Sequence, residues 1–356
     1  MTRMTVYFNR EGHVSRLVSA LFLLSKASEI HIDFVENTDN FRNVPHAQIV
    51  EVEVDQRTIA FDMCDAFALN NEKGQRYLEK VDLYFKRSYN KTIDLGLPEE
   101  ALHKIRPYGF DYYLTCPGNP LDRKPTGAKA IARKFVRDIT GYSASTYPPF
   151  FEKKADQIQG KPSIIFMTRL WDPEELRLDS GISSDVYAYR EYMIEERHKI
   201  NADRVQIIRE LQRIYGKCFI GGVQDSEFAR RYSPDVILPV RLTRRKPYLQ
   251  KMQSSDICIG SMGLHKSIGW KTGEYVAASR AIVAERFAYE VPGGFLEGKN
   301  YLPFDNVDAC LSSVERLFNN LDEIYRMKRQ NELYYKDYLE PVQQIKNALR
   351  QWDYGD

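Results

Sequence analysis

One stretch, from Asp256 to Glu285, constrains the fold more than any other part of the chain. It contains an apolar run at 257–259, a glycine-bearing loop, a segment with helical spacing at 270–278 and a second apolar run at 281–284. The two apolar runs are too short for helices and carry β-branched residues, which favours strands. This order predicts a crossover of an α/β sheet, with the loop at the carboxyl end of a strand, where such sheets bind ligands.

The loop and the first helical turn have the composition of an anion site. Gly260, Gly263 and Gly269 allow backbone to approach a ligand closely, and the unpaired N–H groups of a first helical turn attract negative charge. Lys271 adds a cation, so a phosphate or diphosphate site is predicted, and Glu274, one turn further, would accept hydrogen bonds from ribose hydroxyls. The alternative is that the glycines serve only the turn and that Glu274 is a solvated helix residue.

This segment resembles the donor-binding region of GT-B glycosyltransferases, especially the bacterial group 1 class. In that class a glycine-bearing loop, a helix with a central glutamate followed by small residues, and an apolar strand occur in this order. The resemblance implies that Glu274 holds the ribose of a nucleotide and that 291–304 forms a glycine-rich turn leading to a short edge strand. The residues that carry it are Gly269, Glu274, Tyr275, Ala277, Ala278, Ser279 and 281–284.

Two departures from that class limit what the resemblance implies. Retaining members carry a glutamate eight positions before the ribose-binding one, where this chain has Lys266, so a retaining mechanism does not follow. Upstream, SIIFMTRLWDP resembles the strand-to-loop turn whose arginine contacts donor phosphate, which implies that role for Arg169. The lysine that often follows five positions later is replaced by Glu174. The alternative for Arg169 is an ion pair with Asp172.

Two histidines are candidate catalytic residues. His265 lies in the glycine-bearing loop and would hydrogen-bond the phosphate or the transferred sugar, or else serve the loop structure. His13 follows the first predicted strand, and the resemblance places that loop on the acceptor side. An imidazole titrates near neutral pH, so His13 is the predicted general base, with a structural or surface role as the alternative.

The first half begins as a βαβ unit and continues as a mixed sheet. A strand at 4–8, a helix at 14–26 and a strand at 29–35 follow from the apolar spacing. The runs at 48–54 and 57–62 flank a turn, which predicts a hairpin and therefore a first sheet that is not purely parallel. Further apolar runs at 81–85 and 111–114 predict two more strands. The first is followed by Lys86 and Arg87, interpreted as a solvated strand end, with contact to a negatively charged acceptor as the alternative.

The chain of 356 residues exceeds what one hydrophobic core usually serves, so two domains are expected. We predict two Rossmann-like α/β domains of GT-B type, the second a doubly wound parallel sheet. The predicted boundaries are an acceptor-side domain at 1–145, a linker at 146–162, a nucleotide-sugar-binding domain at 163–335, and a C-terminal helix at 336–356 that crosses back to the first domain. Pro341 would stand in the first turn of that helix.

Composition excludes several other classes of protein. The 51 basic and 49 acidic side chains nearly cancel, which gives no electrostatic case for nucleic acid. Five cysteines without a CxxC pair favour reduced thiols and argue against a zinc site. The carboxylates of 169–201 alternate with basic residues, as in a salt-bridged surface, so neither a metal nor another cofactor is predicted. Without a membrane-spanning run or a signal-peptide layout, a cytoplasmic location is expected.

A basic helix is predicted at 128–139. Lys129, Arg133 and Arg137 recur every four residues on one face, with apolar side chains more nearly opposite. Such a stripe is solvated, binds an acidic acceptor, or rests on anionic lipid at the inner face of a membrane.

The sequence therefore predicts a metal-independent glycosyltransferase. A sugar would move from a nucleotide-diphosphate donor, held by Arg169, Gly263, Gly269, Lys271 and Glu274, to an acceptor hydroxyl in a cleft between the domains. The acceptor would be a glycan or another hydroxyl compound of surface polysaccharide or glycoconjugate synthesis. Two alternatives remain, a sugar-nucleotide epimerase and a non-catalytic nucleotide-sugar-binding protein on the same fold.

Overall fold

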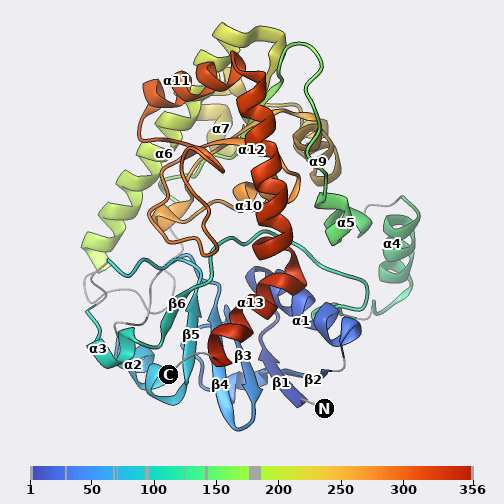
Figure 1. The fold of residues 1–356 in the computed structure, drawn as a ribbon, viewed down its shortest axis with the longest axis vertical. Coiled ribbons are helices and arrows are strands. Elements are labelled where there is room, and N and C mark those ends of the chain that lie inside the picture. The colour runs from blue at the N-terminus through green and yellow to red at the C-terminus, as the bar shows by residue number, and fades with distance from the viewer. Residues whose placement is uncertain are drawn as a thin grey trace. The chain divides into compact units, whose positions relative to one another are not determined.

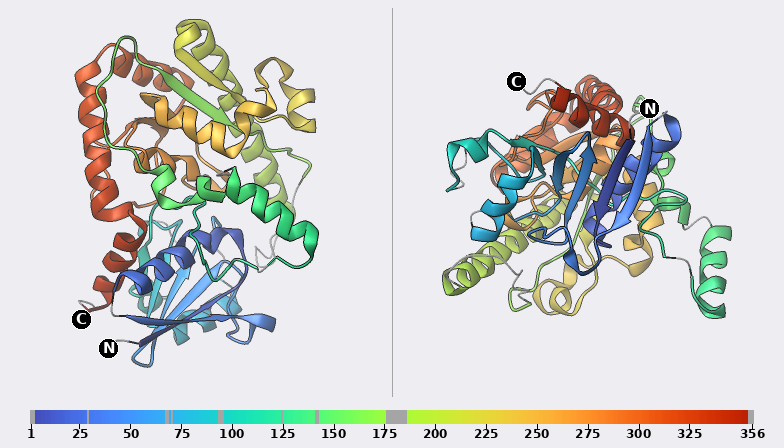
Figure 2. Two further views of the ribbon diagram at one scale, coloured as in Figure 1. Left: turned by 90° about the vertical axis from the view of Figure 1, so that its right-hand side faces the viewer. Right: turned by 90° about the horizontal axis from the view of Figure 1, so that it is seen from below.

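The structure is a computed structural model in which the chain forms two compact units. Unit 1 comprises Met1–Phe150, Tyr289–Gly293 and Lys336–Asp356, and unit 2 comprises Phe151–Ala288 and Gly294–Tyr335. Each unit is an α/β structure with its own sheet, as predicted (Figures 1 and 2). The residues described are 3–28, 30–66, 69, 71–92, 96–123, 125–140, 143–175 and 186–353.

Unit 1 contains a mixed six-stranded sheet with the order β2-β1-β3-β4-β5-β6. β3 runs antiparallel to both β1 and β4, whereas β2 is parallel to β1, and β5 and β6 continue parallel to β4. The predicted hairpin is thus confirmed, and its turn residues Asp55 and Gln56 both have positive φ angles, as a tight two-residue hairpin requires. The strands are β1 (Arg3–Phe8), β2 (His31–Glu36), β3 (Ile49–Val54), β4 (Arg57–Asp62), β5 (Leu83–Lys86) and β6 (Ile105–Pro107).

The prediction of a strand at 111–114 is wrong. The segment is buried except for Tyr113 but has no regular secondary structure, and β6 lies just upstream of it. Side chains from distant helices satisfy its carbonyl groups: Ser15 Oγ donates to Leu114 O at 2.7 Å, and Gln344 Nε2 donates to Phe110 O at 3.3 Å. Because these partners are far away in the sequence, the apolar pattern alone cannot separate this segment from a buried strand.

The core of unit 1 lies between its sheet and two helices, α1 (Ser15–Ala27) and α13 (Pro341–Asp353). These two helices pack against each other, and α13 begins at Pro341, as predicted (Figure 1). The other helices of the unit are α2 (Glu72–Lys80), α3 (Glu99–Leu102) and α4 (Ala128–Ile139).

Unit 2 contains five parallel strands in the order β11-β10-β9-β7-β8. The predicted parallel sheet is confirmed, including the short edge strand at its end. Gly221 and Gly222 lie inside β8, although glycine usually weakens a strand, and they pair with Phe166 and Met167. The packing of β8 excludes a side chain at Gly221, because a Cβ there would lie 2.0 Å from the Phe219 ring. The strands are β7 (Ile164–Thr168), β8 (Phe219–Val223), β9 (Ile257–Gly260), β10 (Ala281–Glu285) and β11 (Leu302–Phe304).

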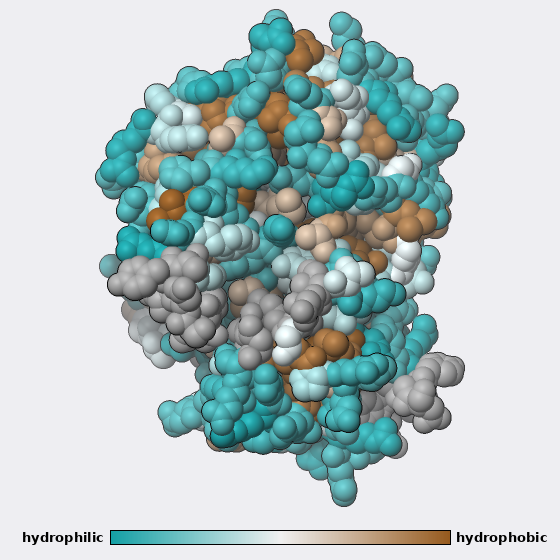
Figure 3. Space-filling view, turned by 90° about the vertical axis from the view of Figure 1, so that its left-hand side faces the viewer, coloured by the Kyte–Doolittle hydropathy of each residue, from teal (hydrophilic) through white to brown (hydrophobic). Residues whose placement is uncertain are grey.

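Helices cover both faces of this sheet, so unit 2 is doubly wound. From β7 the chain moves one way to β8 and the other way to β9, β10 and β11, and right-handed crossovers in opposite directions place their helices on opposite faces. The chain between β7 and β8 includes the 30-residue helix α6. Figure 3 shows the molecule from the side on which α6 lies in Figure 1, and the surface there is mainly hydrophilic. The helices are α6 (Val186–Tyr215), α7 (Glu227–Tyr232), α8 (Val240–Thr243), α9 (Arg245–Ser254), α10 (Trp270–Ala277), α11 (Val307–Phe318) and α12 (Leu321–Tyr334), with α5 (Pro148–Phe151) where unit 1 passes into unit 2.

Candidate functional site

The strand order of unit 2 places the predicted donor-binding residues together at the carboxyl ends of its central strands. β7 and β9 are neighbours at which the direction of winding reverses, and α/β sheets bind ligands outside the carboxyl ends of such strands. Arg169 directly follows β7, and the loop containing Gly263, His265 and Gly269 directly follows β9. Residues nearly a hundred positions apart are therefore brought to one switch point.

A buried polar stripe on α6 fixes the loop after β7. Arg197, Asn201 and Arg204 are spaced by four and three residues, so they share one helix face, and all three are at least nine-tenths buried. Asn201 Nδ2 donates to Trp171 O at 2.6 Å, and its Oδ1 accepts from Trp171 N at 2.9 Å. Arg197 Nη1 donates to the carbonyl oxygens of Asp172 and Glu175. The loop that carries Arg169 is thus held by side chains and not by a strand.

Arg204 joins that loop to the loop after β9. Its guanidinium donates to Arg169 O at 2.7 Å, to Met262 O at 2.7 Å and to Ser261 Oγ at 2.9 Å. Burial lowers the pKa of Arg204 to about 10, opposed by the carboxylate of Glu285. Sequence reasoning missed this residue, although its spacing from Ile208, one turn along the apolar face of α6, is a signal of burial.

Lys271, in the first turn of α10, is a second cation of the site whose charged form is disfavoured. Burial lowers the pKa of its ammonium to about 8, Glu274 opposes this, and the guanidinium groups of Arg245, Arg204 and Arg169 lower it further. Its Nζ lies 3.8 Å from the centre of the Tyr248 ring. Four cations therefore converge on this edge of the sheet, an arrangement that a bound anion would stabilise.

Glu274 is neither solvated nor free. Only 2% of it is exposed, so the alternative of a solvated helix residue is wrong. Oε1 accepts from Arg245 Nη1 at 2.6 Å, and Oε2 accepts from the Tyr248 hydroxyl at 2.8 Å. Both partners come from α9 and were not found from the sequence, because nothing in the local pattern links them to α10.

The two predicted glycines are required by the packing of the loop itself. A Cβ at Gly263 would lie 2.5 Å from Ser267 Oγ, and one at Gly269 would lie 2.9 Å from Ser261 O. Gly263 N also donates to Ser267 O at 2.8 Å. The glycines therefore close the loop, and this accounts for them whether or not a ligand approaches.

The loop already holds one carboxylate. His265 and Lys266 have left-handed φ angles of 59° and 55°, and their N–H groups donate to the two oxygens of Glu196, at 3.0 and 3.2 Å. Successive backbone N–H groups of this kind form an anion-binding concavity. The His265 ring stacks on that of Tyr189, with Nε2 3.3 Å from the Tyr189 hydroxyl.

Arg169 presents its guanidinium to the surface over the Trp171 ring, 3.7 Å from the ring centre. Asp172, the alternative partner, accepts instead from Arg231 Nη2 at 3.4 Å. The exposed position leaves the flat guanidinium accessible to a ligand.

His13 belongs to unit 1, in a short 3₁₀ turn directly after β1. Its Nδ1 lies 3.3 Å from Glu11 Oε1 and 3.1 Å from Gln48 Nε2. Asp111, 2% exposed, interacts electrostatically with it, and burial raises the pKa of the Asp111 carboxyl. Within the described part of the chain, Asp111 Oδ1 and Ser88 Oγ are buried without a hydrogen-bond partner. Sequence reasoning missed this polar group because 111–114 was interpreted as a strand.

The interpretation of Lys86 and Arg87 as a solvated strand end is wrong. Both are buried: Lys86 Nζ lies 2.5 Å from Cys64 O and 3.3 Å from Asp62 Oδ2, and Arg87 pairs with Asp65. The carboxyl ends of β4 and β5 lie side by side, which brings Lys86 and Arg87 close to the carboxylates at the end of β4 and just after it. This cluster stabilises the edge of the first sheet.

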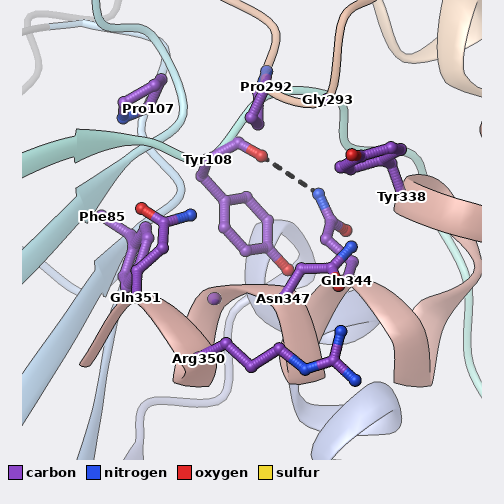
Figure 4. A pocket seen from close by; sticks show the side chains of 11 residues that line it. Phe85, Pro107, Tyr108, Pro292, Gly293, Tyr338, Gln344, Asn347, Arg350 and Gln351 are labelled. Atoms are coloured by element: carbon purple, nitrogen blue, oxygen red, sulfur yellow. Dashed lines mark hydrogen bonds between the residues drawn. The ribbon is translucent and has the colours of Figure 1, made fainter. Parts of the chain in front are cut away.

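Unit 1 also contains a cavity of about 290 Å³ (Figure 4). Its wall is formed by the ends of β5 and β6, the segment at 292–293 and α13. Gln344 Nε2 donates to Tyr108 O at 3.1 Å across it. None of the predicted site residues lines this cavity.

Comparison with known proteins gives similarity of structure without similarity of sequence. No protein-family model and no curated protein matches the chain. A structure of HepE from Anabaena in complex with UDP is 10% identical over 99% of this chain and 100% of that one, with a TM-score of 0.44. UDP-GlcNAc 2-epimerase from Methanocaldococcus jannaschii is 12% identical over 94% and 98%, with a TM-score of 0.38. The C-terminal domain of a group 1 glycosyltransferase from Francisella tularensis is 10% identical over 54% and 97%, with a TM-score of 0.35. At such identities the activity must be inferred from the residues of this chain.

Two further findings concern other kinds of site. Among the described residues, no group of three or more histidine, cysteine or carboxylate side chains is placed to hold a metal ion. Part of the charged segment after β7, including Asp179 and Asp185, lies outside the described residues. No helix in the described ranges is long and apolar enough to cross a membrane.

Proposed function

We propose that unit 2 binds the nucleoside diphosphate of a sugar nucleotide and that the protein transfers the sugar to an acceptor hydroxyl. The observation that carries this proposal is the convergence of Arg169, Arg204, Arg245 and Lys271 at the switch point of the parallel sheet. Their mutual repulsion contributes to the lowered pKa of Lys271. A diphosphate is the ligand chemistry that offsets such a cluster, because it brings two or more negative charges to one place.

The proposed roles follow from position. Arg169 and Lys271 stabilise the negative charge that develops on the departing diphosphate, an electrostatic contribution that needs no covalent step. Glu274 uses two of about four lone-pair sites for Arg245 and Tyr248, and a remaining one accepts a ribose hydroxyl. The N–H groups of Gly263, His265 and Lys266 already donate within the protein, so the loop between Gly263 and Gly269 contributes by its close approach to the ligand. His265 contacts the phosphate or the sugar through its side chain.

On the acceptor side we propose the polar edge of the first sheet. His13 and Asp111 supply a base for the attacking hydroxyl, and the raised pKa of Asp111 brings it nearer to the range in which a carboxylate removes a proton. The acceptor is a hydroxyl compound such as a glycan of a surface polysaccharide or glycoconjugate.

Calorimetry with UDP, GDP, CDP, ADP and dTDP tests the donor site. We expect one nucleotide family to bind and Lys271→Ala to weaken it about tenfold or more, because a hydrogen bond to a charged group contributes about 1.5–3 kcal/mol. Glu274→Gln keeps the hydrogen bond to Tyr248 and should weaken the binding of nucleosides and of nucleotides to the same extent. Lys266→Ala removes an exposed cation from the same loop and is the matched control.

The corresponding sugar nucleotides then test turnover, by the release of nucleoside diphosphate with and without acceptors. Binding that is unaffected by Lys271→Ala would exclude the proposed diphosphate site. Binding that depends on Lys271 without release of nucleoside diphosphate would favour a non-catalytic binding protein.

A further inference from the structure

Helix α4 is an amphipathic helix whose large apolar side chains are mostly exposed. Within α4, all of whose residues the structure describes, no residue is buried. Its large apolar side chains are 56% (Ile131), 65% (Phe135), 57% (Val136) and 69% (Ile139) exposed, the most exposed group of this kind in the described chain. Figures 1 and 2 show α4 standing apart from the sheet of its own unit.

The apolar and the basic side chains of α4 lie on different faces, and Asp138 falls beside Ile131 at the margin of the apolar face. At about 100° per residue, Ile131, Phe135 and Ile139 fall together with Val136 at their margin, whereas Arg133 and Arg137 fall on the opposite side. Lys129 and Lys134 stand at the two borders, and Lys134 Nζ pairs with Asp138 at 2.9 Å. Four basic residues and one acidic residue give the helix a net charge of +3.

A helix of this length needs a surface on which to form. Isolated helices shorter than about 12–15 residues are marginal in water, and most helical stability in proteins comes from packing of the apolar face. The 12 residues of α4 span about 18 Å, too short to cross a bilayer but long enough to lie along one.

We propose that α4 docks unit 1 onto an anionic membrane surface. Bulky apolar side chains would enter the boundary between headgroups and acyl chains, while the lysines and arginines extend toward anionic headgroups. This inference is independent of the proposed sugar transfer. Charge favours a membrane over a second copy of the chain, because a symmetric pair would bring two sets of basic residues together. Nucleic acid would contact the charges but leave Phe135 and its apolar neighbours in water.

Co-sedimentation with vesicles tests the proposal. The full chain should bind vesicles of phosphatidylcholine with phosphatidylglycerol and bind pure phosphatidylcholine far less. Phe135→Ser with Ile139→Ser should lower the partition coefficient about tenfold or more, because burial of each large apolar side chain is lost. Arg133→Gln with Arg137→Gln should lower it about fivefold per charge, and added salt should remove most of that difference.

Two controls distinguish docking through α4 from non-specific hydrophobic binding. Ile214→Ser, 47% exposed in the wild type on α6, removes an exposed apolar residue elsewhere and should leave vesicle binding unchanged. The α4 variants should keep the melting temperature of the wild type, because the residues they change are exposed. Equal binding to neutral and anionic vesicles would overturn the proposal. So would a dimer in solution that is lost in Phe135→Ser with Ile139→Ser, combined with no vesicle binding.

Discussion

At the scale of single residues, Lys271 reports the electrostatics of the candidate site. Its ammonium is held among arginines in a partly buried position, and the carboxylate of Glu274, which opposes their effect, is already shared with Arg245. A lysine with a pKa of about 8 is protonated only in part under mildly alkaline conditions. Above that pH, the binding of any ligand that requires this charge is therefore coupled to the uptake of a proton by Lys271.

This gives a pH dependence with a definite sign. A bound diphosphate raises the pKa of Lys271, so binding favours the protonated form, and affinity should be constant below about pH 8 and fall as pH rises through the pKa of the free protein. The fall should approach about tenfold per pH unit between the free and bound pKa values. Calorimetry between about pH 7 and 10 measures it, a range in which phosphate groups with a pKa of about 6 stay ionised.

Lys271→Arg is the matched control for the pH dependence, because an arginine keeps its charge over the whole range. Its affinity should be nearly independent of pH. An unchanged slope in this variant would assign the proton uptake to another group.

At the scale of elements, the site depends on α6 more than on the loops that carry its charges. The buried stripe of Arg197, Asn201 and Arg204 forms hydrogen bonds with the backbone of the loops after β7 and β9, at positions that lie beyond the hydrogen-bonded strands of the sheet. We expect Asn201→Ala to lower the free energy of unfolding by about 2–3 kcal/mol, because it leaves the N–H and the carbonyl of Trp171 buried and unpaired. It should also weaken nucleotide binding, although it removes no charge.

Chemical denaturation and calorimetry measure both effects of Asn201→Ala. Arg209→Ala on the same helix breaks an exposed ion pair with Asp235 and should change stability by less than about 0.5 kcal/mol. Loss of stability in Asn201→Ala with full nucleotide affinity would show that the loop after β7 does not position the ligand.

The same elements show what a sequence can predict. The strands around Lys271 and the hairpin of β3 and β4 were predictable because apolar period and turn residues are local signals. Glu274 was found for the same reason, from its place in a short helix. Its partners Arg245 and Tyr248 were not, since they arrive from α9 through tertiary packing, as do the side chains that replace a strand at 111–114.

At the scale of the whole molecule, the chain leaves unit 1 and returns to it for its last helix. Gln344 on α13 accepts from Arg16 on α1 and donates to Tyr108 O and Phe110 O. Arg16 is 1% exposed, and it also donates to Leu339 O at 2.5 Å, which comes from the returning segment. The C-terminal segment therefore solvates a charge buried in the first helix of the chain.

Replacing Gln344 by leucine, of similar volume, should destabilise unit 1 selectively. The loss of an acceptor for a buried guanidinium should cost about 2–3 kcal/mol, since hydrogen bonds to charged groups contribute more than neutral ones. Hydrogen exchange should accelerate in β1 and β3–β5 and stay unchanged in β7–β10. Gln343→Leu, which removes only a hydrogen bond to Asn347 on the same helix, is the control and should have little effect. Equal acceleration in both sheets would mean that the returning helix stabilises the protein as one cooperative structure, and then the two units would not be independent in folding.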